Sequence, residues 1–316
     1  MLTAINQDGK LINLLIDCPQ KGEGFCCPGC RGQVRLKQGK IMRSHFAHIR
    51  LEDCHYFYEN ESAQHLELKS HLYRWLKKEA PVEVEAILPK LGQIADLLVG
   101  AKLALEVQCS HLSIQRLQER TQSYQKHGFE VLWLLGKDLW LKDKLTSLQR
   151  QFLRFSQNMG FHLWELDLDR QLLRLRYLIH EDWHGQIQCL TKSYPFEQGE
   201  LLSILRQPYT QQKLASFQGK LDHHLGRYIA QQLYYQAPKW MELQRQAYEK
   251  GENLLTKSPD DFYPQVRLPQ SNIGFVQIRD NLDSYYKDFL MYYKRQKNKN
   301  IQLLYSPAFY KQKTSP

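Results

Sequence analysis

Two carboxylates, Asp96 and Glu106, lie together with Gln108 in a mostly apolar stretch, residues 93–110. The stretch predicts two strands joined by a tight turn at Gly100, where a residue without a Cβ atom tolerates positive φ. If the turn has three residues, Asp96 stands directly opposite Glu106, and a two-residue turn shifts the pairing by one position. Two carboxylates brought together in an apolar hairpin repel each other unless a cation lies between them. The pattern therefore indicates a metal site.

The segment before this hairpin supplies further polar groups. Residues 58–79 are predicted as a helix, with an apolar stripe at helical spacing and Pro81 after its end. Glu61, His65 and Lys69 are four residues apart, so they project from one face of that helix. That face either points at the carboxylates, which would add Glu61 to the metal site, or is an ordinary solvated face. We favour the first interpretation for Glu61 and leave both open for His65 and Lys69.

A second group of potential metal ligands lies near the N-terminus, where four of the seven cysteines, Cys26, Cys27, Cys30 and Cys54, are crowded together. Cys27 and Cys30 have the spacing of a zinc knuckle, and His45 and His48 supply a second pair after a loop of suitable length. In a reducing compartment such crowding favours metal over disulfides. We expect these four residues to bind a structural zinc ion, although a basic loop without metal would have the same residues. Alternative ligands are Cys26, Cys54 and His55.

The net charge of +10 indicates a polyanionic partner, and nucleic acid is the first candidate. Basic residues cluster between residues 25 and 50, where no acid occurs. The candidate nucleic-acid-binding residues are Arg31, Arg35, Lys37, Lys40 and Arg43 there, with Arg116 and Arg120 on a later helix. The chain contains no apolar run long enough to span a bilayer and no signal-peptide pattern at its start. We therefore expect a cytoplasmic protein without membrane insertion.

The elements that would position these residues have the order helix, three strands, helix, strand. An edge-type strand over residues 81–88 precedes the hairpin, and a helix over 110–127 and a buried strand over 130–135 follow it. This order predicts an α/β sheet flanked by helices. We expect three units: a zinc-knuckle-like module over 1–57, the α/β domain over 58–137, and a mainly α-helical region over 138–316. The last of these ends in a basic aromatic tail, which suits either single-stranded nucleic acid or, as we favour, an aromatic core.

The residues resemble two known patterns. Asp96 and Glu106-x-Gln108 on a hairpin, after a helix acid, resemble the PD-(D/E)XK restriction-endonuclease-like core. The first half of the chain resembles the competence protein CoiA family. The motifs that carry the second resemblance are Cys27-Pro-Gly-Cys30, His45-Phe-Ala-His48, Glu61-Ser-Ala-Gln-His65, Asp96, Glu106-Val-Gln-Cys-Ser110, Tyr124 and Val131-Leu-Trp-Leu-Leu135.

The resemblance implies a Mg²⁺- or Mn²⁺-dependent deoxyribonuclease acting on incoming DNA, single-stranded or branched, during natural transformation and recombination. Asp96 and Glu106 would hold the ion, and Glu61, Gln108 and Lys69 would complete the catalytic set. The usual lysine of the nuclease pattern is replaced by Gln108, which carries no charge, and Lys69 is the candidate to compensate. Two other roles therefore stay open: a catalytically inactive DNA-binding recombination accessory factor, and an interaction scaffold for the recombinase or other competence proteins.

Overall fold

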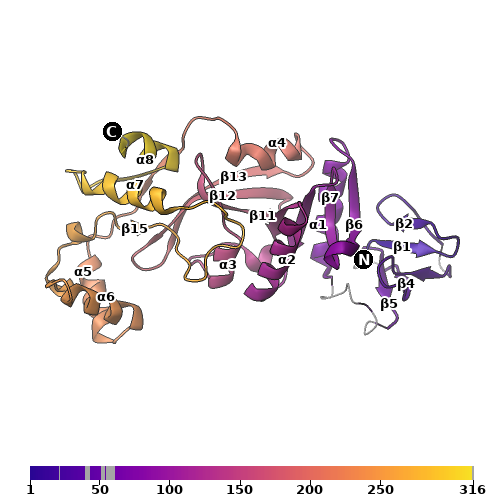
Figure 1. Cartoon of the computed structure of the whole chain (residues 1–316), viewed down its shortest axis with the longest axis horizontal. Helices are drawn as coiled ribbons and strands as arrows, with labels where there is room; N and C mark the ends of the chain where they lie inside the picture. Colours follow the sequence, from indigo (N-terminus) through magenta and orange to yellow (C-terminus); the bar gives the residue numbers. More distant parts are fainter. Residues whose placement is uncertain (21, 40–42, 51–53, 55–60, 315–316) are drawn as a thin grey trace.

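The structure, a computed structural model, describes residues 1–20, 22–39, 43–50, 54 and 61–314 (Figure 1). The expected zinc ligand His55, the basic residue Lys40 and the start of the helix expected from Tyr58 lie outside the described residues. Within them, a small sheet at the N-terminus lies beside a large mixed sheet with helices on both faces, and short helices follow toward the C-terminus (Figure 1).

The N-terminal sheet is antiparallel and has the strand order β2-β1-β3-β4-β5. Its strands are β1 (Thr3–Asn6), β2 (Leu11–Asn13), β3 (Phe25–Cys26), β4 (Gln33–Lys37) and β5 (His45–His48). The apolar core is small: it consists of Ala4, Ile12, Phe25, Val34 and Phe46, with Cys27 and Cys54 packed beside them. A module with so few apolar side chains gains little from burial, so a metal cross-link would contribute much of its stability.

The central sheet has nine strands and is mixed. Its main path runs β13-β12-β11-β9-β8-β7-β6, while β10 pairs with β11 and β15 with β12. The strands are β6 (Val82–Leu88), β7 (Gln93–Val99), β8 (Leu103–Gln108), β9 (Glu130–Leu135), β10 (Arg154–Ser156), β11 (Gly160–Asp167), β12 (Leu172–Asp182), β13 (Ile187–Pro195) and β15 (Val266–Arg267). Strand β9 is parallel to both of its neighbours, β8 and β11.

Helices α1 (Ala63–Leu76) and α2 (Ile114–Lys126) cover opposite faces of this sheet. Leu66, Leu72 and Trp75 of α1 share one core with Leu105 and Val107 of β8. Leu117 and Tyr124 of α2 share the other core with Ala104, Val131 and Trp133. The predicted order of helix, three strands, helix and strand is confirmed, and β6 is an edge strand as expected. Because side chains alternate along a strand, neighbouring β8 residues point to opposite faces of the sheet, so the same hairpin packs against both α1 and α2.

Helix α1 begins later than the sequence predicted, because Ser62 is its N-cap. The Ser62 hydroxyl accepts a hydrogen bond from the backbone N–H of His65 at 3.1 Å, which satisfies one of the unpaired donors of the first turn. Glu61 therefore precedes the helix instead of lying on it. Its carboxylate still reaches the polar face that carries His65 and Lys69.

The expected domain boundary after residue 137 is contradicted by the sheet. Strand β9 pairs with β11 through Trp164 and Leu134, so β10 to β13 continue the same sheet and residues 138–195 are mainly strands. A buried apolar strand such as β9 needs a neighbour on each side. The long hairpin of β11 and β12 supplies the second neighbour.

Of the remaining α-helices, the short α3 precedes β10 in the sequence and the others follow β13. They are α3 (Ser147–Gln151), α4 (Leu201–Arg206), α5 (Leu225–Tyr234), α6 (Pro238–Tyr248), α7 (Asp283–Lys294) and α8 (Pro307–Thr314), with a two-stranded sheet of β14 (Ser216–Gly219) and β16 (Gln302–Tyr305). Tyr293 and Tyr310 of the basic aromatic tail, residues 292–313, are buried and pack with Phe289 of α7, which confirms an aromatic core there. Within the described residues, no helix is long and apolar enough to cross a bilayer.

Candidate active site

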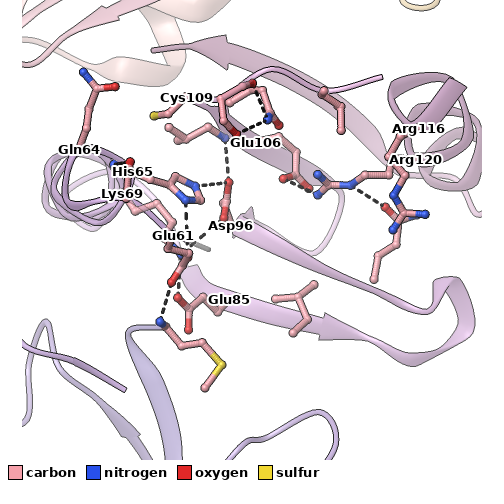
Figure 2. Close-up of a pocket in the computed structure, with 18 of the residues that line it drawn as sticks. Glu61, Gln64, His65, Lys69, Glu85, Asp96, Glu106, Cys109, Arg116 and Arg120 are labelled. Atoms are coloured by element: carbon pink, nitrogen blue, oxygen red, sulfur yellow. Dashed lines mark hydrogen bonds and ion pairs between the residues drawn. The ribbon is translucent and has the colours of Figure 1, made fainter. Parts of the chain in front are cut away.

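A cavity of about 520 Å³ lies where α1, β6, β7, β8 and the start of α2 meet the edge of the N-terminal sheet. All five residues that the sequence predicted as catalytic line it, and so do Arg116 and Arg120. Figure 2 shows the acidic and basic side chains converging from both helices onto the strands between them. The cavity therefore collects residues that are far apart in the sequence.

Glu61, His65 and Asp96 form a cluster of potential metal ligands, with one donor atom of each within 4.8 Å of the others. Nε2 of His65 lies 3.0 Å from Oδ2 of Asp96, and Nδ1 lies 3.7 Å from Oε1 of Glu61 (Figure 2). Oδ2 of Asp96 also accepts a hydrogen bond from the backbone N–H of Val107 at 2.8 Å. Burial would raise the pKa of Asp96, but the neighbouring His65 and Lys69 hold it below its ordinary value.

Lys69 places a fully buried ammonium group beside this cluster. It contacts Glu61, and its Nζ lies 2.7 Å from Oε1 of Glu85 and 3.5 Å from Oδ1 of Asp96. Burial alone would lower the pKa of Lys69, but the three carboxylates raise it well above its ordinary value. A second ammonium group, the N-terminus of Met1, lies 2.5 Å from Oε2 of Glu61. Three carboxylates therefore face two ammonium groups, so with His65 neutral the cluster keeps one negative charge, which a bound cation would compensate.

Glu85 was not predicted from the sequence as part of the site. The alternation of residues 81–88 would send it outward, but its φ of +52° breaks the alternation, and the β6–β7 ladder has no pair at this position. Its carboxylate turns inward to Lys69 and accepts hydrogen bonds from the backbone N–H groups of Leu2 at 2.7 Å and Thr3 at 2.9 Å. Glu85 thus ties the N-terminal strand to the site.

The hairpin register is the one that a three-residue turn predicts, since Leu97 pairs with Leu105 and Val99 with Leu103. The two carboxylates beyond these pairs nevertheless have separate partners. Asp96 binds the residues of α1, whereas Glu106 accepts hydrogen bonds from Arg120 at 2.8 Å and from the hydroxyl of Tyr124. The structure therefore groups Asp96 with Glu61 and His65, not with Glu106.

Glu106 is 1% exposed, and burial raises its pKa to about 7, although Arg120 opposes the shift. Arg120 forms an ion pair with this carboxylate, and its guanidinium group lies 4.9 Å from the ring centroid of Trp133. Arg120, which the sequence suggested as a nucleic-acid-binding residue, is therefore engaged within the protein. Gln108 lines the same cavity and donates a hydrogen bond from Nε2 to the carbonyl oxygen of Ser110 at 3.0 Å.

The N-terminal sheet carries a second cluster of potential ligands, formed by Cys27, Cys30, His48 and Cys54 within 4.8 Å of one another. Nε2 of His48 lies 3.5 Å from Sγ of Cys30. The three cysteines of the cluster form no disulfide bond, and burial raises the pKa of Cys27 to about 12. Three sulfur donors and one imidazole fit a closed, tetrahedral zinc site, and a bound ion would favour the thiolate forms.

The expected ligand His45 is replaced in this cluster by Cys54. His45 and His48 both belong to β5, and residues three apart in a strand point to opposite faces. The ring of His45 instead lies 2.9 Å from the carbonyl oxygen of Arg43, and in the β4–β5 ladder His45 stands opposite Lys37. The pairing of H-x-x-H with C-x-x-C would have required a loop or helix at residues 45–48.

The predicted nucleic-acid-binding residues divide into two groups. Arg31, Arg35 and Lys37 are exposed on the N-terminal sheet. Arg43 is engaged in two hydrogen bonds with Glu67, at 2.7 and 2.9 Å, and Arg120 is bound to Glu106. Arg116 lines the active-site cavity and lies 3.7 Å from Glu119. The exposed group and Arg116 are thus the better candidates for contacts with phosphate.

Comparison with known proteins places this geometry in a family. A family model described as "Competence protein CoiA, N-terminal domain" matches residues 15–57, and one described as "Competence protein CoiA, nuclease-like domain" matches residues 61–208. Together they cover more than half of the 316 residues. The chain belongs to the competence protein CoiA family. The cluster of Cys27, Cys30, His48 and Cys54 lies within the N-terminal match, and Glu61 of the other candidate metal cluster is the first residue of the nuclease-like match.

A relative, "Competence protein CoiA" of Bacillus subtilis (strain 168), is 33% identical over 150 residues. The similar segment is 46% of this chain and 38% of the relative. No solved structure matches the chain. The nuclease-like match extends well past residue 137, in agreement with the continuous central sheet.

Proposed function

We propose that this CoiA-family chain is a divalent-metal-dependent deoxyribonuclease, built on a PD-(D/E)XK-like core, that acts on single-stranded or branched DNA during natural transformation. The observation that carries the proposal is the cluster of Glu61, His65 and Asp96 inside a cavity that also contains Glu106 and Gln108. The nuclease-like family match supports the same reaction class. The excess of carboxylates over cations beside Lys69 fits a site for a metal ion.

The ligands of that ion would be the carboxylates of Glu61 and Asp96 and the ring of His65. When bound, a divalent ion supplies Lewis acidity toward a phosphodiester oxygen and lowers the pKa of bound water. The protein residues around it orient and neutralise the reacting groups. The Lys69 ammonium, 3.5 Å from Oδ1 of Asp96, carries the positive charge that Gln108 cannot supply. Gln108 would orient the attacking water by hydrogen bonding.

We propose Glu106 as an additional metal ligand, which can reach the ion only after its ion pair with Arg120 is broken. In the structure, Arg120 and Tyr124 hold the carboxylate of Glu106 on the α2 side of the sheet. A phosphate entering the cavity would compete for the Arg120 guanidinium, because Arg binds phosphate and carboxylate through the same forked donors. Loss of that ion pair would leave the Glu106 carboxylate available to the metal site.

The test is cleavage of labelled single-stranded, duplex and branched DNA with Mg²⁺ or Mn²⁺, by the wild type and by Asp96→Asn. This substitution keeps the shape of the side chain and the hydrogen bond from Val107 but removes the charge. We expect cleavage to fall at least about a hundredfold, the size of effect typical when a group that stabilises the transition state is removed. Glu119→Gln, an exposed acid of α2, is the matched control and should cleave normally. Equal cleavage by wild type and Asp96→Asn would refute the proposal.

Gln108 and the ion pair of Glu106 with Arg120 favour a second candidate function, DNA binding without cleavage. Gln108 stands where the nuclease pattern has a lysine, and Glu106 is already neutralised by Arg120. Both features would suit a DNA-binding recombination accessory factor that keeps the nuclease-like core without turnover. This alternative predicts no cleavage with either metal ion, and DNA binding that weakens with salt to the same extent in wild type and Asp96→Asn.

A further inference from the structure

A second cavity, of about 510 Å³, lies between α3, the end of β12, β15 and the start of α6, on the other side of the first turn of α2. Its basic lining residues are Arg150, Lys239 and Arg267, and Glu181 is the acid among them. Its size is in the range of ligand-binding sites. Neither the nuclease-like chemistry nor the zinc-type cluster uses any of these residues.

The positive charge in this cavity is only partly compensated. Arg150 donates a hydrogen bond to each carboxylate oxygen of Glu181, at 2.6 and 2.7 Å, so this pair is neutral and internally satisfied. Arg267 stands opposite Glu181 in the β12–β15 ladder, but Glu181 is already occupied. Among the described residues, Arg267 and Lys239 have no acidic partner within ion-pair distance. Two cations at the wall of one cavity therefore lack an ion-pair partner, and the carboxylates of Glu181 and Asp182 act on them only from a greater distance.

Arg267 has a fixed position and an unused hydrogen-bond donor, two features of an anion-binding arginine. Its guanidinium stacks 4.8 Å from the ring centroid of Trp183, and its Nε atom is buried without a hydrogen-bond acceptor. Burial lowers the pKa of Arg267, and Arg150 adds to this effect while Glu181 opposes it. A buried N–H donor without an acceptor costs free energy, so an incoming anion would relieve both the charge and the missing hydrogen bond.

Gln151 provides a neutral polar group in the same wall. It is 1% exposed, its Nε2 donates to Oγ of Ser271 at 3.1 Å, and its Oε1 has no partner. A half-turn of the amide would let the Ser271 hydroxyl donate to Oε1 and would turn Nε2 into a second donor for the ligand. An amide, a forked guanidinium and an ammonium group are together suited to a tetrahedral oxyanion with several acceptor atoms.

The position of the cavity indicates which oxyanion this is. Ile114 lines the second cavity, while the preceding residues Leu112 and Ser113 line the candidate active site. Successive Cα atoms are about 3.8 Å apart, so the first turn of α2 is a wall shared by both cavities. We propose that the second cavity is a phosphate-binding site formed by Arg267, Lys239 and Gln151. It would hold a backbone phosphate of a nucleic acid strand that passes the start of α2 into the active site.

The assignment of this phosphate to nucleic acid rests on the proposed function, whereas the phosphate site itself does not. Binding of a labelled oligothymidylate is measured by fluorescence anisotropy without added Mg²⁺ or Mn²⁺, so that no cleavage is needed. Arg267→Gln/Lys239→Gln is compared with Arg227→Gln/Lys250→Gln, which removes the same charge from exposed positions of the α5–α6 region. We expect the cavity variant to bind about tenfold more weakly and to lose about one to two units of salt slope. The control should change much less.

Equal weakening by the two double variants would overturn the proposal, because it would show that only total charge matters. In a second arm, inorganic phosphate is titrated calorimetrically. If wild type binds phosphate, the cavity variant does not, and oligothymidylate binding is unchanged, the site is real but its ligand is a free phosphate, and the assignment to nucleic acid is overturned. Lys239 is exposed, so Lys239→Gln alone tests the site if the double variant does not fold. Asp96→Asn should retain oligothymidylate binding, which separates this result from failure of the nuclease proposal.

Discussion

Arg120 and Glu106 form a buried ion pair in which Nη2 of the arginine lies 2.8 Å from Oε2 of the carboxylate. Even with this cation beside it, burial raises the pKa of Glu106 from its ordinary 4.5 to about 7. The folded chain therefore binds the proton more tightly than the unfolded chain does. The resulting stabilisation is fully present below pH 4.5 and is lost as the pH rises through about 7.

Glu106→Gln should remove this pH dependence, because an amide does not titrate. A shift from 4.5 to about 7 corresponds to about 3 kcal/mol. We expect the free energy of unfolding of the wild type, relative to Glu106→Gln, to fall by about this amount from acid to mildly alkaline pH. Urea unfolding over a pH series measures the difference, with Glu119→Gln as the control. Parallel curves for wild type and Glu106→Gln would show that Glu106 ionises normally.

Lys69→Met should destabilise the fold strongly. The substitution removes the ammonium group that contacts Glu61, Glu85 and Asp96 and leaves only the N-terminal ammonium of Met1, which contacts Glu61. Breaking a buried ion pair from one side costs about 3 to 5 kcal/mol. Because a divalent ion can replace the lost charge, Mn²⁺ should raise the thermal midpoint of Lys69→Met more than that of wild type. Lys77→Met, at an exposed position just after α1, is the control. A midpoint of Lys69→Met that does not respond to Mn²⁺ would argue against a metal site here.

The parts of the site that the sequence predicts are those set by short-range periodicity. The period of two in β8 predicts that Glu106 and Gln108 share a face, and both line the cavity. The turn at Gly100 predicts the register in which Leu97 pairs with Leu105 and Val99 with Leu103. The spacing of four that relates Glu61, His65 and Lys69 also brings them together, even though Glu61 precedes the helix. In each case the nearest neighbours in sequence decide the geometry.

What the sequence does not predict depends on tertiary contacts or on one unusual backbone angle. Glu85 enters the site only because its φ is positive, and no residue type at that position signals this. The partners of Arg120 and Glu106 follow from the packing of α2 on the sheet, since helix periodicity alone makes Arg120 look solvated. The continuation of the sheet past residue 137 requires the pairing of β9 with β11, which is not a local property.

The mixed donor set of the active-site cluster predicts a preference for Mn²⁺ over Mg²⁺. Mg²⁺ demands oxygen ligands in near-ideal octahedral geometry, whereas the ring of His65 offers nitrogen, which transition ions accept more readily. We expect faster cleavage with Mn²⁺ in the wild type. His65→Asp, which supplies a third carboxylate, should narrow or reverse the preference. Cleavage rates measured at matched concentrations of the two ions test this, and an unchanged ratio in His65→Asp would exclude His65 as a ligand.

The N-terminal cluster predicts which residues bind zinc: Cys54 and His48 should be ligands, and His45 should not. His48 and Cys54 belong to the cluster, whereas His45 lies on the other face of β5 with its ring next to the carbonyl oxygen of Arg43. Cys54→Ser should therefore lose bound zinc, and His45→Ala should retain about one ion per chain. Metal content after dialysis, measured by atomic emission, distinguishes the two variants.

Loss of zinc should also lower the stability of the N-terminal sheet. Its apolar core is small, and zinc binding to such modules contributes directly to folding. Added chelator should therefore lower the thermal midpoint of the wild type and of His45→Ala, but should leave that of Cys54→Ser unchanged. Zinc retained by Cys54→Ser and lost by His45→Ala would restore the ligand set expected from the sequence, and residues 45–48 could then not form the strand described here.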